Sequence, residues 1–193
     1  MKNCSLLITS FQDVVTIPKI LLKIVLIGDG AVGKTSIRRR YMGEGFRTDF
    51  LATMGADFAF LETTLDDSVL QWQIWDLAGQ PAFRKVMKAY YKGSFGALAI
   101  YDVTQPKTLD SIDGWVAEAR ERAMTFSELP VVIIGNKIDL REEVPNSLKT
   151  IQGFAKARAL NSGFVETSAK TGEAIGEAFD ELARKIILLR DES

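Results

Sequence analysis

The segment from residue 28 to residue 36 has the composition of a phosphate-binding loop. Its first eight residues, Gly-Asp-Gly-Ala-Val-Gly-Lys-Thr, match the pattern GxxxxGK[ST] at every fixed position. Small residues let such a loop wrap around a diphosphate, so that backbone N–H groups face the phosphate oxygens. Lys34 would add a positive charge beside the β- and γ-phosphates, and the Thr35 hydroxyl is a suitable Mg²⁺ ligand. We therefore expect a nucleotide to contact Gly28, Asp29, Gly30, Ala31, Val32, Gly33, Lys34, Thr35 and Ser36.

A phosphate-binding loop alone is compatible with a kinase, an ATPase or a GTPase, and a second motif narrows this choice. Asp76 begins the sequence Asp-Leu-Ala-Gly-Gln at the end of an expected strand. Its carboxylate would hold a magnesium-bound water, and the N–H of Gly79 would donate to a γ-phosphate. Gln80 both donates and accepts hydrogen bonds, as the orientation of an attacking water requires where no strong base is present. Taken alone, the same residues could also form a turn that begins with Asp.

A third motif concerns the base of the nucleotide. The sequence Asn-Lys-Ile-Asp at residues 136–139 follows an apolar strand. Asp139 can accept from both N1–H and the 2-amino group of guanine, whereas adenine would leave this carboxylate unpaired. The stem of Lys137 would lie on the base plane, and the N–H of Ala169 would donate to guanine O6. The expected base-binding residues are Asn136, Lys137, Asp139, Ser168, Ala169 and Lys170.

These motifs require strands and helices that alternate along the chain. Apolar runs at residues 20–27, 97–101, 131–135 and 164–167 are separated by segments of helical periodicity, which predicts an α/β fold. Near-continuous apolar strands are typical of a parallel sheet that is covered on both faces. Residues 57–65 and 69–75 predict a hairpin that adds an antiparallel edge. The apolar face at residues 174–189 predicts a closing helix.

Length and composition are those of one globular domain. The chain has 193 residues, of which 47% are hydrophobic and 25% charged, and its net charge of −1 gives no reason to expect nucleic-acid binding. It contains no histidine, which excludes histidine-based catalysis and histidine-ligated zinc sites. Its only cysteine, Cys4, cannot form an internal disulfide. Apolar runs too short for a membrane span, and an N-terminus without the features of a secretory signal, predict a cytoplasmic protein.

Residues 1–18 form an N-terminal extension to a predicted domain at residues 19–193. Apolar side chains in this extension recur at helical spacing, and Pro18 would end a helix before the first strand. Three interpretations are open: a segment that packs on the domain or is disordered, an amphipathic helix on a membrane surface, or an error in the start codon. Lys2 is its only basic residue, which argues against the membrane helix.

Taken in chain order, these motifs resemble those of the Ras superfamily of small GTPases, and its Rab-like branch most of all. The resemblance covers about residues 20–189 and includes the segments 50–58, 90–93 and 101–104. It implies the small G domain of the P-loop NTPases: an α/β fold with a mostly parallel six-stranded sheet, one antiparallel edge strand, and helices on both faces. It also implies a monomeric switch that binds Mg–GTP, hydrolyses it to GDP and phosphate, and recruits effectors in the GTP state.

The roles of Thr53 and Phe46 follow from the resemblance only. Thr53 would be the switch threonine, with its hydroxyl on Mg²⁺ and its N–H on the γ-phosphate, and Phe46 would pack edge-on against guanine. The implied metal ligands are Thr35, Thr53 and, through water, Asp76. The implied catalytic residues are Gln80, Lys34 and Thr53. The implied partners are effectors, which would bind residues 46–58 and 79–91, an exchange factor, and a GTPase-activating protein whose arginine speeds a slow intrinsic reaction.

Several positions depart from the family pattern. Pro81 stands where an acidic residue usually follows the glutamine, which puts the usual route of nucleotide exchange in doubt. The sequence ends Leu-Arg-Asp-Glu-Ser without the cysteines that carry prenyl groups in the family. We therefore expect a protein that works in solution, or one that reaches membranes through its N-terminal extension or a partner, and a role in vesicle traffic is less strongly implied. The run Arg38-Arg39-Arg40 is expected to be a solvated helix face.

Two other functions share part of these motifs. One is a GTP-binding scaffold that never hydrolyses its nucleotide, against which Gln80 and Gly30 argue, because Gly30 leaves room for an arginine finger. The other is a nucleoside or nucleotide kinase, which would need an arginine-rich lid and would leave residues 136–139 without a role.

Overall fold

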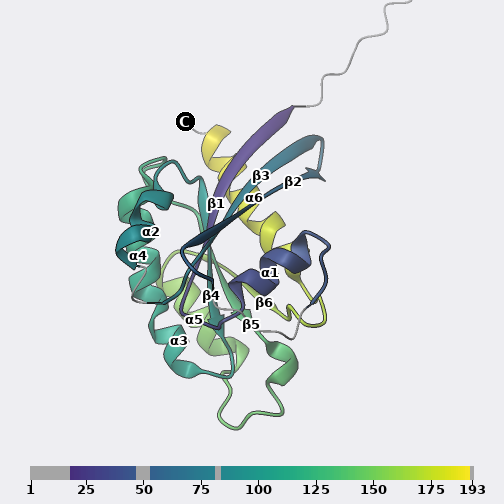
Figure 1. Ribbon diagram of the computed structural model, residues 1–193, viewed down its shortest axis with the longest axis vertical. Coiled ribbons are helices and arrows are strands. Elements are labelled where there is room, and N and C mark those ends of the chain that lie inside the picture. Colours follow the sequence, from purple (N-terminus) through teal and green to yellow (C-terminus); the bar gives the residue numbers. More distant parts are fainter. Residues whose placement is uncertain (1–17, 47–52, 81–83, 192–193) are drawn as a thin grey trace, which may run out of the picture.

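The computed structural model describes residues 18–46, 53–80 and 84–191 of the chain, and a six-stranded sheet forms its centre (Figure 1). The strand order is β2-β3-β1-β4-β5-β6, in which β2 is the antiparallel edge strand and the other neighbours are parallel. This confirms the predicted fold class. The strands are β1 (Lys19–Ile27), β2 (Ala56–Leu65), β3 (Ser68–Leu77), β4 (Gly96–Asp102), β5 (Val131–Asn136) and β6 (Gly163–Thr167).

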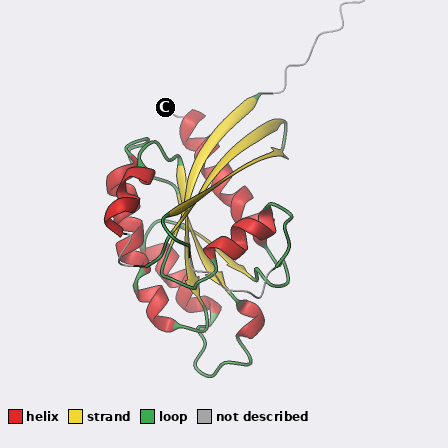
Figure 2. Cartoon of the chain, in the orientation of Figure 1, coloured by secondary structure: helices red, strands yellow, loops and turns green. Residues whose placement is uncertain are grey.

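Helices cover both faces of the sheet, as predicted (Figure 2). Helices α1 and α6 pack on one face, and α2, α3, α4 and α5 pack on the other. The helices are α1 (Lys34–Tyr41), α2 (Arg84–Tyr91), α3 (Pro106–Asp110), α4 (Ile112–Ala123), α5 (Thr150–Ala159) and α6 (Ile175–Asp191), with a short 3₁₀ helix, η2 (Ile138–Leu140). Helix α6 is the predicted closing helix.

Aromatic rings fix α1 against the sheet. Tyr41, at the end of α1, stacks on Phe179 of α6 with ring centroids 3.6 Å apart and meets the edge of Trp72 of β3 at 6.0 Å. Trp72 and Phe179 are fully buried. This packing holds the opposite end of α1, at Lys34, beside the end of β1, where the phosphate-binding motif lies.

Strand β3 extends beyond the predicted strand by one residue at its start and by two at its end. The expected hairpin strand ends at residue 75, but Asp76 pairs with Leu26 of β1 on one side and Asp57 of β2 on the other, and Leu77 pairs with Ala56. The cause is pairing on both edges, which the local sequence does not reveal. Asp76 therefore lies within the sheet rather than in the loop that follows it.

The parallel strands bring the sequence motifs to one edge. Asp102 is paired with Asn136, and Asn136 with Thr167, so the ends of β4, β5 and β6 lie side by side. The strand order reverses between β1 and β4, and such a switch point is the usual ligand site of an open α/β sheet.

The remaining predictions about chain organisation are not tested by the fold. Residues 1–17 of the predicted N-terminal extension lie outside the described residues, so the boundary at residue 18 stays a prediction. Within the described part of the chain, each helix is too short or too polar to cross a bilayer.

Candidate nucleotide-binding site

The phosphate-binding motif forms a tight loop between β1 and α1. Gly33, the residue before α1, has φ +101°, and a Cβ at this position would lie 2.3 Å from the Nδ2 of Asn136. Gly28 has φ +134°, and a Cβ there would lie 2.1 Å from the carbonyl oxygen of Ile100. These two positions therefore require glycine both for conformation and for space.

The side chain of Lys34 bends back into this loop. Its Nζ donates to the carbonyl oxygen of Gly28 over 2.9 Å and to that of Asp29 over 2.7 Å. Lys34 is 6% exposed, and this burial lowers the pKa of its ammonium to about 8, against the opposing charges of Asp76 and Asp29. The loop thus encloses a buried cation, which a phosphate group would stabilise.

Three predicted metal ligands meet at the start of α1. The Oγ1 of Thr35 donates to Oδ2 of Asp76 over 2.5 Å, and it lies 3.0 Å from Oγ1 of Thr53. Burial raises the pKa of the Asp76 carboxyl, and the hydrogen bond from Thr35 and the charge of Lys34 oppose this shift. The Oδ1 of Asp76 is buried, and no partner for it is found among the described residues. Hydroxyl and carboxylate oxygens with an unsatisfied acceptor are a donor set that fits Mg²⁺.

The second motif packs directly on the phosphate-binding loop. A Cβ at Gly79 would lie 2.4 Å from the carbonyl carbon and oxygen of Asp29, so the two backbones touch. Gln80 is exposed, and its Cγ lies 3.8 Å from the position that a Cβ would occupy at Gly30. The structure therefore brings the side chain of Gln80 next to Gly30 of the loop, and its role in orienting a water stays a prediction.

Asn136 joins the phosphate-binding loop to the base-binding segments. Its Nδ2 donates to the carbonyl oxygen of Val32 over 2.9 Å, and its Oδ1 accepts from Oγ1 of Thr167 at 3.1 Å and from the N–H of Ala169 at 3.2 Å. The Ala169 N–H that we expect to meet guanine O6 is thus directed at Asn136. Asn136 is 1% exposed, so these bonds are shielded from water.

The residues expected to read the guanine edge lie together as well. The Oγ of Ser168 donates to Oδ1 of Asp139 over 2.6 Å, and Nζ of Lys170 lies 3.8 Å from Oδ2 of the same carboxylate. These contacts hold the carboxylate that the sequence assigns to guanine. Its role in binding the base stays a prediction.

Some predicted residues are described only in part. Phe46 is 42% exposed and Ser36 is half-buried in α1, and their roles stay predictions. Residues 47–52 lie outside the described residues. Pro81 and residues 82–83 of the second switch segment lie outside them as well.

The interpretation of Arg38-Arg39-Arg40 as a solvated face is wrong for two of the three residues. Arg38 is 6% exposed, and its Nη2 donates to Oδ2 of Asp57 over 2.7 Å. Arg40 donates from Nε to the carbonyl oxygen of Ala169 over 3.1 Å and from Nη2 to that of Lys170. Helical periodicity does not reveal these partners, because they come from β2 and from the loop after β6.

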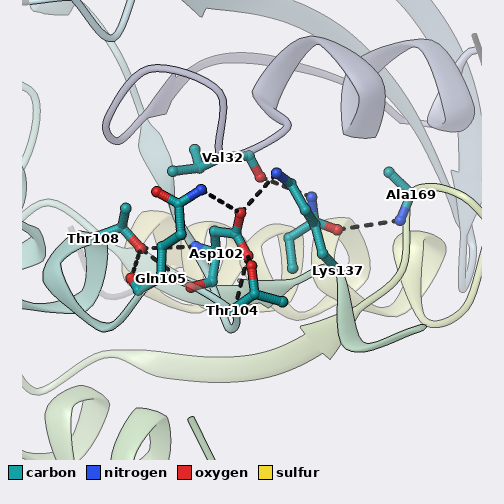
Figure 3. Close-up of polar contacts among 8 residues, drawn as sticks. Val32, Asp102, Thr104, Gln105, Thr108, Lys137 and Ala169 are labelled. Atoms are coloured by element: carbon teal, nitrogen blue, oxygen red, sulfur yellow. Dashed lines mark hydrogen bonds and ion pairs between the residues drawn. The ribbon is translucent and has the colours of Figure 1, made fainter. Parts of the chain in front are cut away.

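The sequence motifs assign no role to two further residues at this site. The Oδ2 of Asp102, at the end of β4, lies 2.7 Å from Nζ of Lys137 (Figure 3). Trp115 of α4 donates from Nε1 to Oδ1 of Asp29 over 2.8 Å. An acidic residue that directly follows an apolar strand was a visible signal for Asp102, whereas nothing in the sequence points to Trp115.

Known proteins are similar to this chain over most of its length. The model of the Ras family matches residues 23–188. The chain is 39% identical over 167 residues to Ras-related protein Rab-8 of Diplobatis ommata, covering 86% of this chain and 78% of the relative. It is 38% identical over 175 residues to Ras-related protein Rab-7a of Dictyostelium discoideum, covering 90% and 86%. It is 39% identical over 166 residues to GTP-binding protein ypt2 of Schizosaccharomyces pombe, covering 86% and 81%. The chain therefore belongs to the Ras family, as a Rab-like GTPase.

Proposed function

We propose that this GTPase binds Mg–GTP between its phosphate-binding loop and residues 136–139, hydrolyses it, and recruits effectors only in the GTP state. The proposal rests on one cluster: the Thr35 hydroxyl, the Thr53 hydroxyl and the Asp76 carboxylate meet beside the buried ammonium of Lys34. This cluster combines oxygen ligands for a divalent cation with a positive charge for phosphate oxygens.

Hydrolysis would proceed by direct attack of water, without a covalent intermediate. Bound Mg²⁺ would neutralise charge on the phosphate oxygens. Gln80 orients the water through its amide, which both donates and accepts. The Lys34 ammonium and the backbone N–H groups of the loop stabilise the charge that develops on the transferred phosphoryl group. A partner's arginine raises the rate of such reactions by about 10³–10⁵-fold, so the intrinsic reaction is expected to be slow.

The switch would depend on Thr53. Its hydroxyl lies 3.0 Å from that of Thr35, and Gly55 accepts the N–H of Ala78 over 2.9 Å, so the segment before β2 is tied both to the metal cluster and to β3. Loss of the γ-phosphate would remove one partner of Thr53 and release this segment. Order and disorder of a segment in response to one phosphate is how such switches change their binding surface.

Aromatic side chains beside the two switch segments provide a surface for effectors. The ring centroids of Phe58 and Trp75 lie 5.0 Å apart, as do those of Trp75 and Tyr90, and Phe58 is 46% exposed. Exposed aromatic residues are frequent anchors of protein interfaces. In the proposed function the chain acts as a monomer in the cytoplasm, and an exchange factor and an activating protein set its state.

The test is to identify and follow the bound nucleotide. The purified protein is denatured and the released nucleotide is identified by chromatography; GTP-loaded protein is then incubated for hours beside a Gln80→Leu variant. We expect guanine nucleotide, with GDP formed at least about tenfold more slowly by the variant. Gln71→Leu removes a glutamine that bonds Glu62 on the hairpin and serves as the control. Adenine nucleotide would contradict the role of Asp139, and equal rates in parent and Gln80→Leu would contradict that of Gln80.

A further inference from the structure

A buried carboxylate lies beside the base-binding segment and has no part in the proposed hydrolysis. Asp102 is the last residue of β4 and is 1% exposed. Its Oδ2 lies 2.7 Å from Nζ of Lys137, the first residue after β5 (Figure 3). A charge so fully removed from water needs a charged or hydrogen-bonded partner, and the lysine supplies the charge.

The two oxygens of this carboxylate have different partners. Oδ1 accepts from the backbone N–H of Thr104 at 2.9 Å and from its Oγ1 at 2.7 Å. Oδ2 faces Lys137 and also lies 3.4 Å from Nε2 of Gln105. The backbone N–H of Asp102 donates to Oγ1 of Thr108 over 3.0 Å, so its main chain is held as well. The orientation of the carboxylate is therefore set before any ligand binds.

Lys137 is constrained at both ends. Its backbone has φ 68° and ψ 35°, a left-handed conformation that residues with a Cβ adopt rarely. Its carbonyl oxygen accepts the N–H of Leu140 over 3.0 Å at the start of η2. With the ammonium held by Asp102, the four methylene groups of the side chain run between two fixed points. A long lysine side chain otherwise loses much rotamer freedom when it is ordered by a ligand.

We propose that Asp102 is a positioning residue for the nucleotide, which holds the ammonium of Lys137 so that the lysine stem is preorganised against the face of the purine base. The inference rests on the proposed assignment of Lys137 to the base. Preorganisation removes part of the entropy loss of binding, so it slows dissociation of the nucleotide. Because the stem contacts the face of the base and not its edge, the effect is the same for guanine and for hypoxanthine.

The test begins with Asp102→Asn, which keeps the shape of the side chain. The N–H of Thr104 keeps the amide oxygen at the Oδ1 position, so the amide nitrogen faces Lys137 and cannot accept its proton. We expect GDP carrying a fluorescent label to dissociate about tenfold faster than from the parent, because a charge-assisted hydrogen bond is lost. Asp113→Asn breaks another lysine–carboxylate pair, with Lys156 at 2.5 Å between α4 and α5, although Asp113 is exposed, and should leave the rate unchanged.

A double-mutant cycle shows whether Asp102 acts through Lys137. Lys137→Met should also speed dissociation, and the double variant Asp102→Asn with Lys137→Met should dissociate no faster than Lys137→Met alone. Rate increases that multiply in the double variant would show that Asp102 acts on the loop after β4 instead, and would overturn the inference. Competition with IDP adds a second readout. A loss of discrimination between GDP and IDP in Asp102→Asn would also overturn it, since this would mean a disturbed Asp139.

The inference and the proposed function fail in different ways. A parent protein that binds no guanine nucleotide would overturn both. A parent that binds it, with fast dissociation from Lys137→Met and the parent's rate from Asp102→Asn, would overturn the inference alone. If Asp102→Asn does not fold, Lys137→Arg takes its place, because arginine keeps a cation opposite Asp102. Lys137→Arg should then dissociate more slowly than Lys137→Met, and equal rates would overturn the inference.

Discussion

The indole N–H of Trp115 donates to Oδ1 of Asp29 over 2.8 Å and joins α4 to the phosphate-binding loop. The backbone carbonyl oxygen of the same Asp29 accepts a hydrogen bond from Nζ of Lys34 at 2.7 Å. Trp115 is 3% exposed, so water has little access to this bond. Helix α4 thereby holds the loop that encloses the buried lysine, although Trp115 and Asp29 stand 86 residues apart in the chain.

Trp115→Phe should weaken this connection. The variant keeps an aromatic ring but leaves Oδ1 of Asp29 without its donor, so we expect the free energy of unfolding in urea to fall by about 1 kcal/mol and GDP to dissociate faster. Thr63→Val is the control, because it removes the acceptor of another indole N–H, the bond from Nε1 of Trp72 to Oγ1 of Thr63 over 2.8 Å on the hairpin, and keeps the ring of Trp72. The control should lose similar stability without faster dissociation. Equal dissociation rates in both variants would contradict a role for Trp115 in holding the loop.

Gly33→Ala should disrupt the nucleotide site more than Gly43→Ala does. A Cβ at Gly33 would displace Nδ2 of Asn136 and break its bond to Val32, in addition to the strain of φ +101°. We expect at least about 2 kcal/mol less stability and loss of nucleotide binding. Gly43 has φ +78° with no atom within 4 Å of a Cβ, so Gly43→Ala should cost only about 1 kcal/mol. Urea unfolding measures the stability of both variants, and nucleotide titration measures their binding. Similar results for the two variants would refute the contact with Asn136 as the cause.

Nucleotide affinity should fall as the pH rises above 8. Burial lowers the pKa of Lys34 to about 8 in the free protein, whereas a bound diphosphate raises it by its negative charge. Between these two pKa values binding takes up a proton, so GDP binding should be about tenfold weaker at pH 9 than at pH 7. Lys34→Arg does not titrate in this range. Its affinity, though lower, should not depend on pH, and an equal fall in this variant would assign the effect to another group.

The pair Arg38 and Asp57 should respond unequally to the loss of either partner. The side chain of Arg38 is 7% exposed and that of Asp57 is 55% exposed. Asp57→Ala removes the carboxylate to which the buried guanidinium donates and should lower the free energy of unfolding by about 1–3 kcal/mol. Arg38→Met removes the buried charge together with an Nε that has no partner among the described residues, so about 1 kcal/mol or less is expected. Thermal and urea unfolding measure the stability of both variants. A larger loss of stability in Arg38→Met than in Asp57→Ala would contradict this prediction.

Much of the fold could be predicted from local patterns. The apolar runs at residues 20–27 and 131–135 lie within β1 and β5, whose residues 24–27 and 131–136 are buried, as expected for strands covered on both faces. The end of β3 was missed, since Asp76 is polar and is held in the sheet by pairing with two other strands. The partners of Arg38 and Arg40 were missed because they lie on β2 and on the loop after β6, far from α1 in the sequence.

The sequence by itself determined the identity and order of the motifs, because the phosphate-binding loop and the segment 136–139 depend on residue types at short, defined spacings. The tertiary structure alone decided which of these residues share a contact. Asp102 meets Lys137, and Trp115 meets Asp29, only because strand register and helix packing bring distant segments to one edge of the sheet. Contacts of this kind leave no local pattern, since each partner alone is compatible with many environments.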